Sequence, residues 1–580
     1  MRESTATEDT RKPERNGDEM RRPIGKEYAA GLANILGCVA INLGMLTATT
    51  TAFASPLPDP NAYRRLDDRQ LGHIDWIVTV ANRPGGDWTE MGAAEPGQGG
   101  FDSYRYQLAM MSYTLDLANY HYTPAYRELY QAADRALIDK MLREDVWGFW
   151  ELTSRGSKMF DPDLQALGDG WIDPIKEQNI MYSGHLFQMV ATHAMLFNDP
   201  TFEQPGGIQL VYDPVGRGLG KQVFSYTTRS LADTLYRQFE RSEWRGIECE
   251  PNAIFPECNQ HPILGYRAME ARAPTGQYEI VSRRFKAKFD AMKYIDPKTK
   301  SFMGLYLKRQ DKMVYDALPW SDGWAGAFMH AWSKADVEAV YPIQRANYLT
   351  TLANGAATVK IDKPRGSYSH DHGFFAVLAA EVGDERTKTA LLAYADAYWN
   401  PKWDADGLRY PRYDAYRLAS DPPHVWRRVQ VLTGNALIGL ARIDVGDGLY
   451  TLYSKPRSPA AFDEPFISDI DNRVTKVARA VYDPANNALI VTLRAARALP
   501  GNRPLPSTST RWTINNLTNG PYDIRRDGAL IATVKDTVAT SKSASHDKLN
   551  LAAPGRLTIV SDIDEEATYI VTRTAPSLGR

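Results

Sequence analysis

Between about residue 65 and residue 450, apolar residues recur three and four positions apart, which is the spacing of one face of a helix. The pattern is clearest in four segments, residues 104–122, 125–144, 225–241 and 386–400. Loops rich in Gly, Pro and Asp separate such segments, at residues 81–88, 93–100 and 202–218. This alternation predicts a mainly α domain over residues 60–452, a toroid in which inner and outer helices alternate around a central pocket.

The pattern changes after about residue 455. Residues 477–496 hold two alternating apolar runs around Asp-Pro-Ala-Asn-Asn, which predicts a β-hairpin. Strand-like alternation continues through residues 510–536, 556–561 and 567–573. We therefore expect a small antiparallel β-sandwich in residues 453–580.

The first 54 residues have the pattern of an export signal. Arg21, Arg22 and Lys26 precede a long apolar stretch, and Ala52-Phe53-Ala54 offers the small-x-small pattern of a cleavage site before Ser55. The mature protein is then expected to be periplasmic or secreted, with no stable membrane span. A retained membrane anchor is the alternative, because the apolar stretch is near the lower length limit for crossing a bilayer.

Composition narrows the function classes. A formal net charge of −2 provides no basic surface for nucleic acid. The 31 Tyr and 13 Trp suit a pocket that holds a sugar or an apolar organic molecule, and they equally suit a large aromatic core.

Two of the chain's three cysteines, Cys249 and Cys258, lie close together in the sequence. Pro251 and Pro256 between them exclude a continuous helix, so this segment must be a loop. The loop is compatible with a disulfide, which is common in exported proteins, or with a pair of working thiols. A metal site would need His185 or His261 as further ligands, because the spacing is not that of a zinc motif.

The motif "GIECEPNAIFPECNQ", residues 246–260, follows "DPIKEQNIMYSGHL", residues 173–186. Together with "KMLREDVWGFWE" and "IDPKTKSFMGLY", these motifs resemble the linalool dehydratase-isomerase family over most of residues 70–450. The resemblance implies a periplasmic enzyme on an (α/α)6 toroid that uses no metal or organic cofactor. The β-domain is not part of it.

The resemblance also implies the site. The family's catalytic residues fall on Cys249, Cys258, His185, Asp75 and Tyr106. Substrate contacts are expected from three further residues, Met181, Trp324 and Glu250. Two positions depart from the family pattern, because Ala81 and Trp324 stand where the family has tyrosines.

Dehydration of a tertiary allylic alcohol needs an acid for the leaving hydroxyl and a base for a neighbouring carbon-bound proton. His185 is expected to titrate near neutral pH and to exchange protons with thiols of pKa about 8.5, with Cys249, Cys258 and Tyr106 at the hydroxyl. Asp75 would take the carbon-bound proton. A covalent thioether through one cysteine stays open.

The predicted protein is thus a cofactor-independent hydro-lyase or isomerase whose partner is a small hydrophobic alcohol or alkene. A homo-oligomer is left open. One alternative is a carbohydrate-active hydrolase or lyase whose carboxylate pair comes from this set: Glu151, Glu177, Glu248, Glu250, Asp322 and Asp371. Another is a non-catalytic exported binding protein with a Cys249–Cys258 disulfide. Each residue also has a purely structural interpretation, in which His185 is a core residue and Asp75 caps a helix or joins an ion pair.

Overall fold

The computed structural model describes residues 57–92, 100–214, 220–360, 368–500, 508–518, 520–535, 538–541 and 547–574. The predicted export segment, residues 1–54, lies outside these ranges. Within them, the helices are too short or too polar for any of them to cross a membrane.

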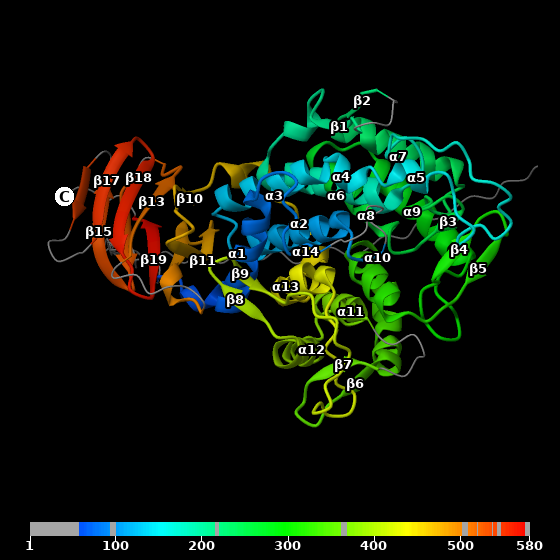
Figure 1. Cartoon of the computed structure of the whole chain (residues 1–580). Helices are drawn as coiled ribbons and strands as arrows, with labels where there is room; N and C mark the ends of the chain where they lie inside the picture. The colour runs from blue at the N-terminus through cyan, green and yellow to red at the C-terminus, as the bar shows by residue number, and fades with distance from the viewer. Residues whose placement is uncertain are drawn as a thin grey trace, which may run out of the picture. The chain divides into compact units, whose positions relative to one another are not determined.

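The chain is mainly α (Figure 1). The longer helices are α1 (Asp68–Asn82), α2 (Tyr104–His121), α3 (Glu128–Met141), α6 (Ile180–Phe197), α7 (Thr228–Arg241), α8 (Gln260–Arg272), α9 (Gln277–Ala291), α10 (Pro319–Tyr348), α11 (Ser369–Glu381) and α12 (Glu385–Tyr398). Shorter ones are α4 (Glu144–Trp147), α5 (Trp150–Thr153), α13 (Ile438–Ile443) and α14 (Gly448–Ser454). The helices predicted in residues 104–122, 125–144, 225–241 and 386–400 are confirmed as α2, α3, α7 and α12.

Helices of two kinds build the core. Every residue of α6 and α11 is buried, and α2 is buried along nearly its whole length. By contrast, α7 buries a single face through Leu231, Leu235 and Phe239, four residues apart. Such a helix covers a core whose centre is made by the fully buried ones.

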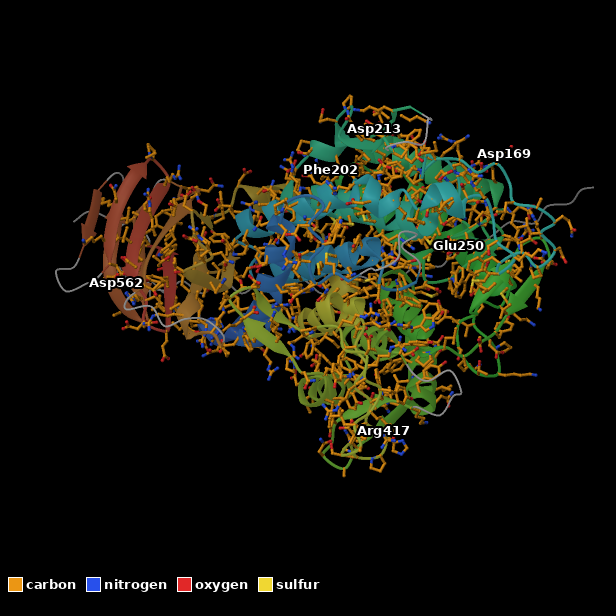
Figure 2. All side chains as sticks on the ribbon, in the orientation of Figure 1. Asp169, Phe202, Asp213, Glu250, Arg417 and Asp562 are labelled. Atoms are coloured by element: carbon orange, nitrogen blue, oxygen red, sulfur yellow. The ribbon has the colours of Figure 1, made fainter. Side chains whose placement is uncertain are left out.

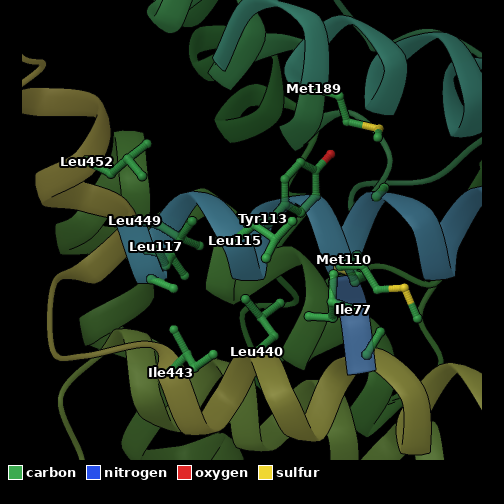
Figure 3. Close-up of a cluster of buried hydrophobic side chains, with 14 of the residues drawn as sticks. Ile77, Met110, Tyr113, Leu115, Leu117, Met189, Leu440, Ile443, Leu449 and Leu452 are labelled. Carbon is green, nitrogen blue, oxygen red and sulfur yellow. The ribbon is translucent and has the colours of Figure 1, made fainter. Parts of the chain in front are cut away.

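The buried helices contact one another in a closed series. α2 packs on α6, α6 on α8, α8 on α10, α10 on α11, α11 on α13, and α13 returns to α2. Figure 3 shows part of this core, where Met110 and Tyr113 of α2 lie among apolar side chains of neighbouring helices, including Leu440 and Ile443 of α13. The Tyr113 hydroxyl points towards α6, which carries Met189.

Short antiparallel strands lie in the connections between the helices. They are β1 (Ile208–Tyr212) with β2 (Gln222–Tyr226), β3 (Ala253–Ile254) with β4 (Leu305–Leu307) and β5 (Lys312–Val314), β6 (Leu349–Thr351) with β7 (Ala357–Val359), and β8 (Lys402–Asp404) with β9 (Gly407–Arg409). The expected loop at residues 202–218 therefore contains β1, so that prediction was wrong in part. Ile208, Leu210 and Tyr212 are buried there, in the alternation that a strand requires.

The C-terminal region is antiparallel β structure. The predicted hairpin is confirmed as β11 (Thr475–Asp483) and β12 (Ala488–Ala495). The other strands are β10 (Phe466–Ser468), β13 (Ser509–Asn515), β14 (Tyr522–Arg526), β15 (Ala529–Lys535), β16 (Val538–Ser541), β17 (Lys548–Ala553), β18 (Arg556–Asp562) and β19 (Glu566–Arg573).

These strands form two sheets, with orders β10-β13-β18-β17 and β11-β12-β19-β14-β15-β16. Trp512 of β13 and Tyr569 of β19 meet with their ring centroids 4.9 Å apart. One aromatic pair thus joins the two sheets.

Strand β11 is hydrogen-bonded to the helical region along its free edge. The amide of Leu66 donates to the carbonyl of Ala478, at 2.9 Å. The amide of Ala125 donates to the carbonyl of Ala480, also at 2.9 Å. Backbone segments before α1 and after α2 therefore continue the sheet.

Candidate active site

The Cys249–Cys258 segment is a loop, as predicted, and it is tightly fixed. The Cys249 amide donates to the carbonyl of Ala253 at 2.8 Å, and Asn252 adopts a left-handed φ of 78°, which asparagine tolerates better than most residues. The side chain of Asn259 clamps the base of the loop, accepting from the Ile247 amide at 2.8 Å and donating to the Ile247 carbonyl at 3.0 Å. The loop thus holds both cysteines at defined positions at the start of α8.

Both cysteines are free thiols and both are buried, with exposed fractions of 1% for Cys249 and 4% for Cys258. Burial raises the pKa of both thiols. The interaction between the two thiols raises the pKa of Cys249 further and lowers that of Cys258. At neutral pH the pair carries its protons, and Cys258 is the more readily ionised member.

His185 projects from α6 into the same region. Its Nδ1 lies 2.9 Å from the hydroxyl of Tyr113, which makes no other hydrogen bond to the described residues. When the hydroxyl donates to Nδ1, the neutral imidazole carries its proton on Nε2. In the described part of the chain that buried Nε2 finds no hydrogen-bond partner.

His185 does not titrate near neutral pH, so that expectation is corrected. Its side chain is completely buried, and burial, helped by the nearby Arg105 guanidinium, lowers its pKa to about 3. The imidazole is a neutral hydrogen-bond donor in the resting protein.

A second histidine, His261 of α8, lies against the first with ring centroids 3.7 Å apart. Its Nε2 accepts from Nε1 of Trp324 at 2.7 Å, so its own proton is on Nδ1, which donates to Oε1 of Gln188 at 2.7 Å. Trp324 therefore fixes the tautomer of His261, and the ring of Tyr106 lies edge-on to Trp324 at 5.2 Å.

Arg105 supplies a cation that the sequence analysis did not identify. Its guanidinium lies 4.5 Å from the ring centroid of Tyr106 and 4.2 Å from that of Phe149, and its Nη2 is 3.6 Å from the sulfur of Met181. The residue is 3% exposed. A charged residue beside Tyr106 in an otherwise apolar helical pattern was the available signal.

Buried carboxyl groups lie beside the thiols. Burial raises the pKa of Glu250 to about 7 and that of Glu257 to about 8. Glu257 accepts from the hydroxyl of Ser321 at 3.2 Å, and the charge of nearby Asp322 raises its pKa further. Glu257 was missed by the sequence analysis, although it directly precedes Cys258.

Asp75 is not brought to this site. Its Oδ1 accepts from Nζ of Lys476 at 2.6 Å and from Nδ2 of Asn472 at 3.3 Å, both in the C-terminal region. Figure 1 shows α1 and β3 on different sides of the helical region, and Figure 2 places Glu250 on the side of β3. The ion pair corresponds to the alternative role considered for Asp75.

The carboxylates considered for a carbohydrate-active site are mostly engaged elsewhere. Glu151 pairs with Arg155 at 2.8 Å, Glu248 with Lys308 at 2.8 Å, and Asp371 accepts from the amide of Tyr368 as a helix cap. Glu177 lies 3.8 Å from Arg241 at the surface. Asp322 accepts from the Tyr348 hydroxyl and the Phe302 amide, both at 2.6 Å. Glu250 differs from these groups because its buried Oε2 accepts no hydrogen bond from a described residue.

Over the described ranges, no group of three or more His, Cys, Asp or Glu side chains is arranged to hold a metal ion. A cavity of about 560 Å³ lies between α3 and β10, and Arg127, Arg135 and Phe466 line it. None of the site residues contributes to that cavity.

Solved structures with partial likeness are enzymes that act on carbohydrates. An inactive variant of an α-1,6-mannanase from Salegentibacter sp. HEL1_6, in complex with α-1,6-mannotriose, is 12% identical with a TM-score of 0.36, covering 66% of this chain and 99% of that one. An unsaturated glucuronyl hydrolase specific for heparin is 11% identical with a TM-score of 0.37, covering 67% and 99%. The GH76 α-mannanase BT2949 of Bacteroides thetaiotaomicron is 10% identical with a TM-score of 0.35, covering 60% and 87%. TM-scores of this size carry no argument about activity.

The family comparison is specific. The model of the linalool dehydratase/isomerase family matches residues 105–416, which is more than half of the chain. The matched segment contains Tyr106, His185, Cys249 and Cys258, and it begins after Asp75. The chain belongs to the linalool dehydratase/isomerase family.

Proposed function

We propose that this protein is an exported hydro-lyase or isomerase that dehydrates or isomerises a tertiary allylic alcohol, without a metal or organic cofactor. The observation that carries the proposal is the pair of buried, free thiols, Cys249 and Cys258, in a family member, with burial raising the pKa of both. Such a pair can give a proton to a leaving hydroxyl without needing a charged acid.

Cys258 is the proposed proton donor. As its S–H bond breaks, the thiolate is stabilised by its interaction with the Cys249 thiol and by the positive charge of Arg105, both of which lower the pKa of Cys258. Neutral His185 offers its Nε2–H to the substrate oxygen, which positions the hydroxyl for that proton. The hydroxyl then departs as water.

The surroundings suit the cationic carbon that departure of water creates. The rings of Tyr106 and Trp324 lie next to His185, at centroid distances of 5.7 Å and 5.8 Å. Aromatic faces attract cations, and the burial of these rings keeps water from adding to the carbon. Because Trp324 replaces a tyrosine of the family pattern, we expect a preferred substrate that differs in shape from linalool.

The architecture proposed with this function is an (α/α)6 toroid followed by a β-sandwich. The closed series of contacts from α2 to α13 and back supports the toroid, and the Trp512–Tyr569 contact between two sheets supports the sandwich. Export to the periplasm or the medium rests on the sequence of residues 1–54.

A panel of tertiary alkenols, offered to the purified protein, tests the function through the appearance of alkene. Cys258→Ala should lower kcat by at least about 100-fold, the usual contribution of a general acid. Cys249→Ala should cost less, because Cys258 keeps its proton. Unchanged turnover in both variants would contradict the proposal, as would the absence of any product from the wild type.

A further inference from the structure

Elimination needs a base as well as an acid, and Asp75 is held by Lys476 away from the thiols. We propose that Glu250 is the catalytic residue that accepts the carbon-bound proton. This inference rests on the proposed function, because it assigns a further role within the same reaction.

The position of Glu250 supports the assignment. It directly follows Cys249, and its charge acts on Cys249, Cys258 and Tyr106. Its Oε2 is buried, and no described residue offers it a hydrogen bond. A buried carboxylate oxygen without a donor is a strong base for its environment, and it is open to an incoming proton.

Glu248 provides a comparison within the same loop, because the two glutamates flank Cys249. Glu248 is engaged by Nζ of Lys308 at 2.8 Å. Glu250 has no such partner among the described side chains, and its Oε2 is buried although the residue as a whole is partly exposed. Glu250 therefore keeps a carboxylate oxygen that can accept a proton.

Glu257 is the other buried carboxyl nearby, and its geometry suits the role less well. Its carboxyl accepts from Ser321, and the residue is only 2% exposed. The Ser321 hydroxyl thus already occupies a carboxyl oxygen of Glu257. Glu250 is therefore preferred as the acceptor.

The charge state of Glu250 is compatible with proton transfer at neutral pH. The charged and titratable groups that face it are Arg105, Tyr106, Cys249, Glu257 and Cys258. Burial raises its pKa to about 7 and Arg105 opposes that rise, so a large fraction of the protein holds the carboxylate at pH 7 to 8.

The proton and electron balance closes with these groups. Cys258 gives its proton to the substrate oxygen, the C–O bond breaks, and water leaves with the bonding electron pair. The electrons of the adjacent C–H bond form the C=C bond, and the proton passes to a Glu250 oxygen. Loss of that proton to solvent and uptake of one by the Cys258 thiolate restore the site, so alcohol becomes alkene plus water.

The test compares Glu250→Gln with the matched control Glu248→Gln in the full chain. With an alkenol that the wild type converts, Glu250→Gln should lower kcat by about 100-fold or more, while Glu248→Gln leaves kcat unchanged. In deuterium oxide, the wild type should place deuterium on the carbon next to the alcohol carbon of recovered substrate or product, and Glu250→Gln should not. The assignment is overturned if Glu250→Gln still incorporates deuterium fully. It is also overturned if Asp75→Asn loses deuterium incorporation while Glu250→Gln keeps it.

Two further measurements keep folding and function separate. Glu250→Asp retains a carboxylate, so it should recover part of the activity lost in Glu250→Gln if the carboxylate acts chemically. Equal loss of activity in both variants, with circular dichroism spectra like that of the wild type, overturns the proposal. In the wild type, the infrared absorption of protonated carboxyl groups should include a component that titrates near pH 7. Glu250→Gln should lack this component, and the measurement needs no substrate. If the wild type converts no alkenol, the proposed function fails, whereas titration of Glu250 near pH 4 overturns this inference by itself.

Discussion

The ion pair between Asp75 and Lys476 makes a measurable prediction about stability. The Nζ–Oδ1 distance is 2.6 Å, and the two side chains are 8% and 11% exposed, for Lys476 and Asp75 respectively. Asp75→Asn leaves an ammonium group in this site without its anion. Breaking one side of a buried pair typically costs about 3–5 kcal/mol.

That free energy converts into a modest shift of the melting temperature, because the folded unit is large. At about 2.1 cal/mol/K of unfolding entropy per residue, the residues from 55 to 580 give roughly 1.1 kcal/mol/K. The expected decrease in Tm is therefore about 3–5 °C for Asp75→Asn, and a similar decrease is expected for Lys476→Met, measured by calorimetry.

The double variant Asp75→Asn/Lys476→Met is the decisive control. Because it removes both charges, its loss of stability should be smaller than the sum of the two single losses by at least about 1 kcal/mol. Strict additivity would refute the view that Asp75 serves as a partner for Lys476. Loss of catalysis in Asp75→Asn without a loss of stability would also refute it. That result would support the catalytic role of Asp75 that the family resemblance implies.

Two other predictions concern the buried polar groups around the thiols. Trp324→Phe removes the donor to Nε2 of His261 and leaves a buried acceptor unsatisfied, so the free energy of unfolding in urea should fall by about 1–3 kcal/mol. Trp320→Phe, at a partly buried residue, should cost less, and equal losses would contradict the assigned hydrogen bond. Burial raises the pKa of Glu257 in the folded protein from 4.5 to about 8, so the folded protein binds this proton more tightly than the unfolded chain does. The resulting stabilisation is complete below pH 4.5 and is lost as the pH rises to about 8. Glu257→Gln should therefore flatten the decline in unfolding free energy between pH 5 and pH 9, and a slope identical to that of the wild type would count against this assignment.

Local patterns in the sequence predicted much of the fold. The apolar spacing in residues 104–122 and 125–144 identified α2 and α3, because a helix that buries one side must repeat every three to four residues. The hairpin of β11 and β12 followed from two alternating runs around a turn. The strand β1 was missed, since five residues between Gly-rich segments resemble a loop.

The site was predictable only in part. Pro251 and Pro256 were enough to place the cysteines on a loop, whereas the partner of Asp75 lies 401 residues away in sequence and no local pattern reveals it. The protonation of His185 was predicted wrongly, because its pKa depends on complete burial and on Arg105. Burial of a charged or titratable group is a property of the packed core, and a single sequence gives little information about it.

The hydrogen bonds along β11 bear on how this chain avoids self-association. A strand at the end of a sheet normally exposes unpaired amides and carbonyls, which can template the addition of a strand from another molecule. Here the segments around Leu66 and Ala125 occupy those groups, so the helical region protects the outer strand. A chain cut near residue 455 would leave backbone amides and carbonyls of β11 unpaired and able to bind a strand from another molecule. The backbone hydrogen bonds between the two regions therefore also cap the edge of the sheet.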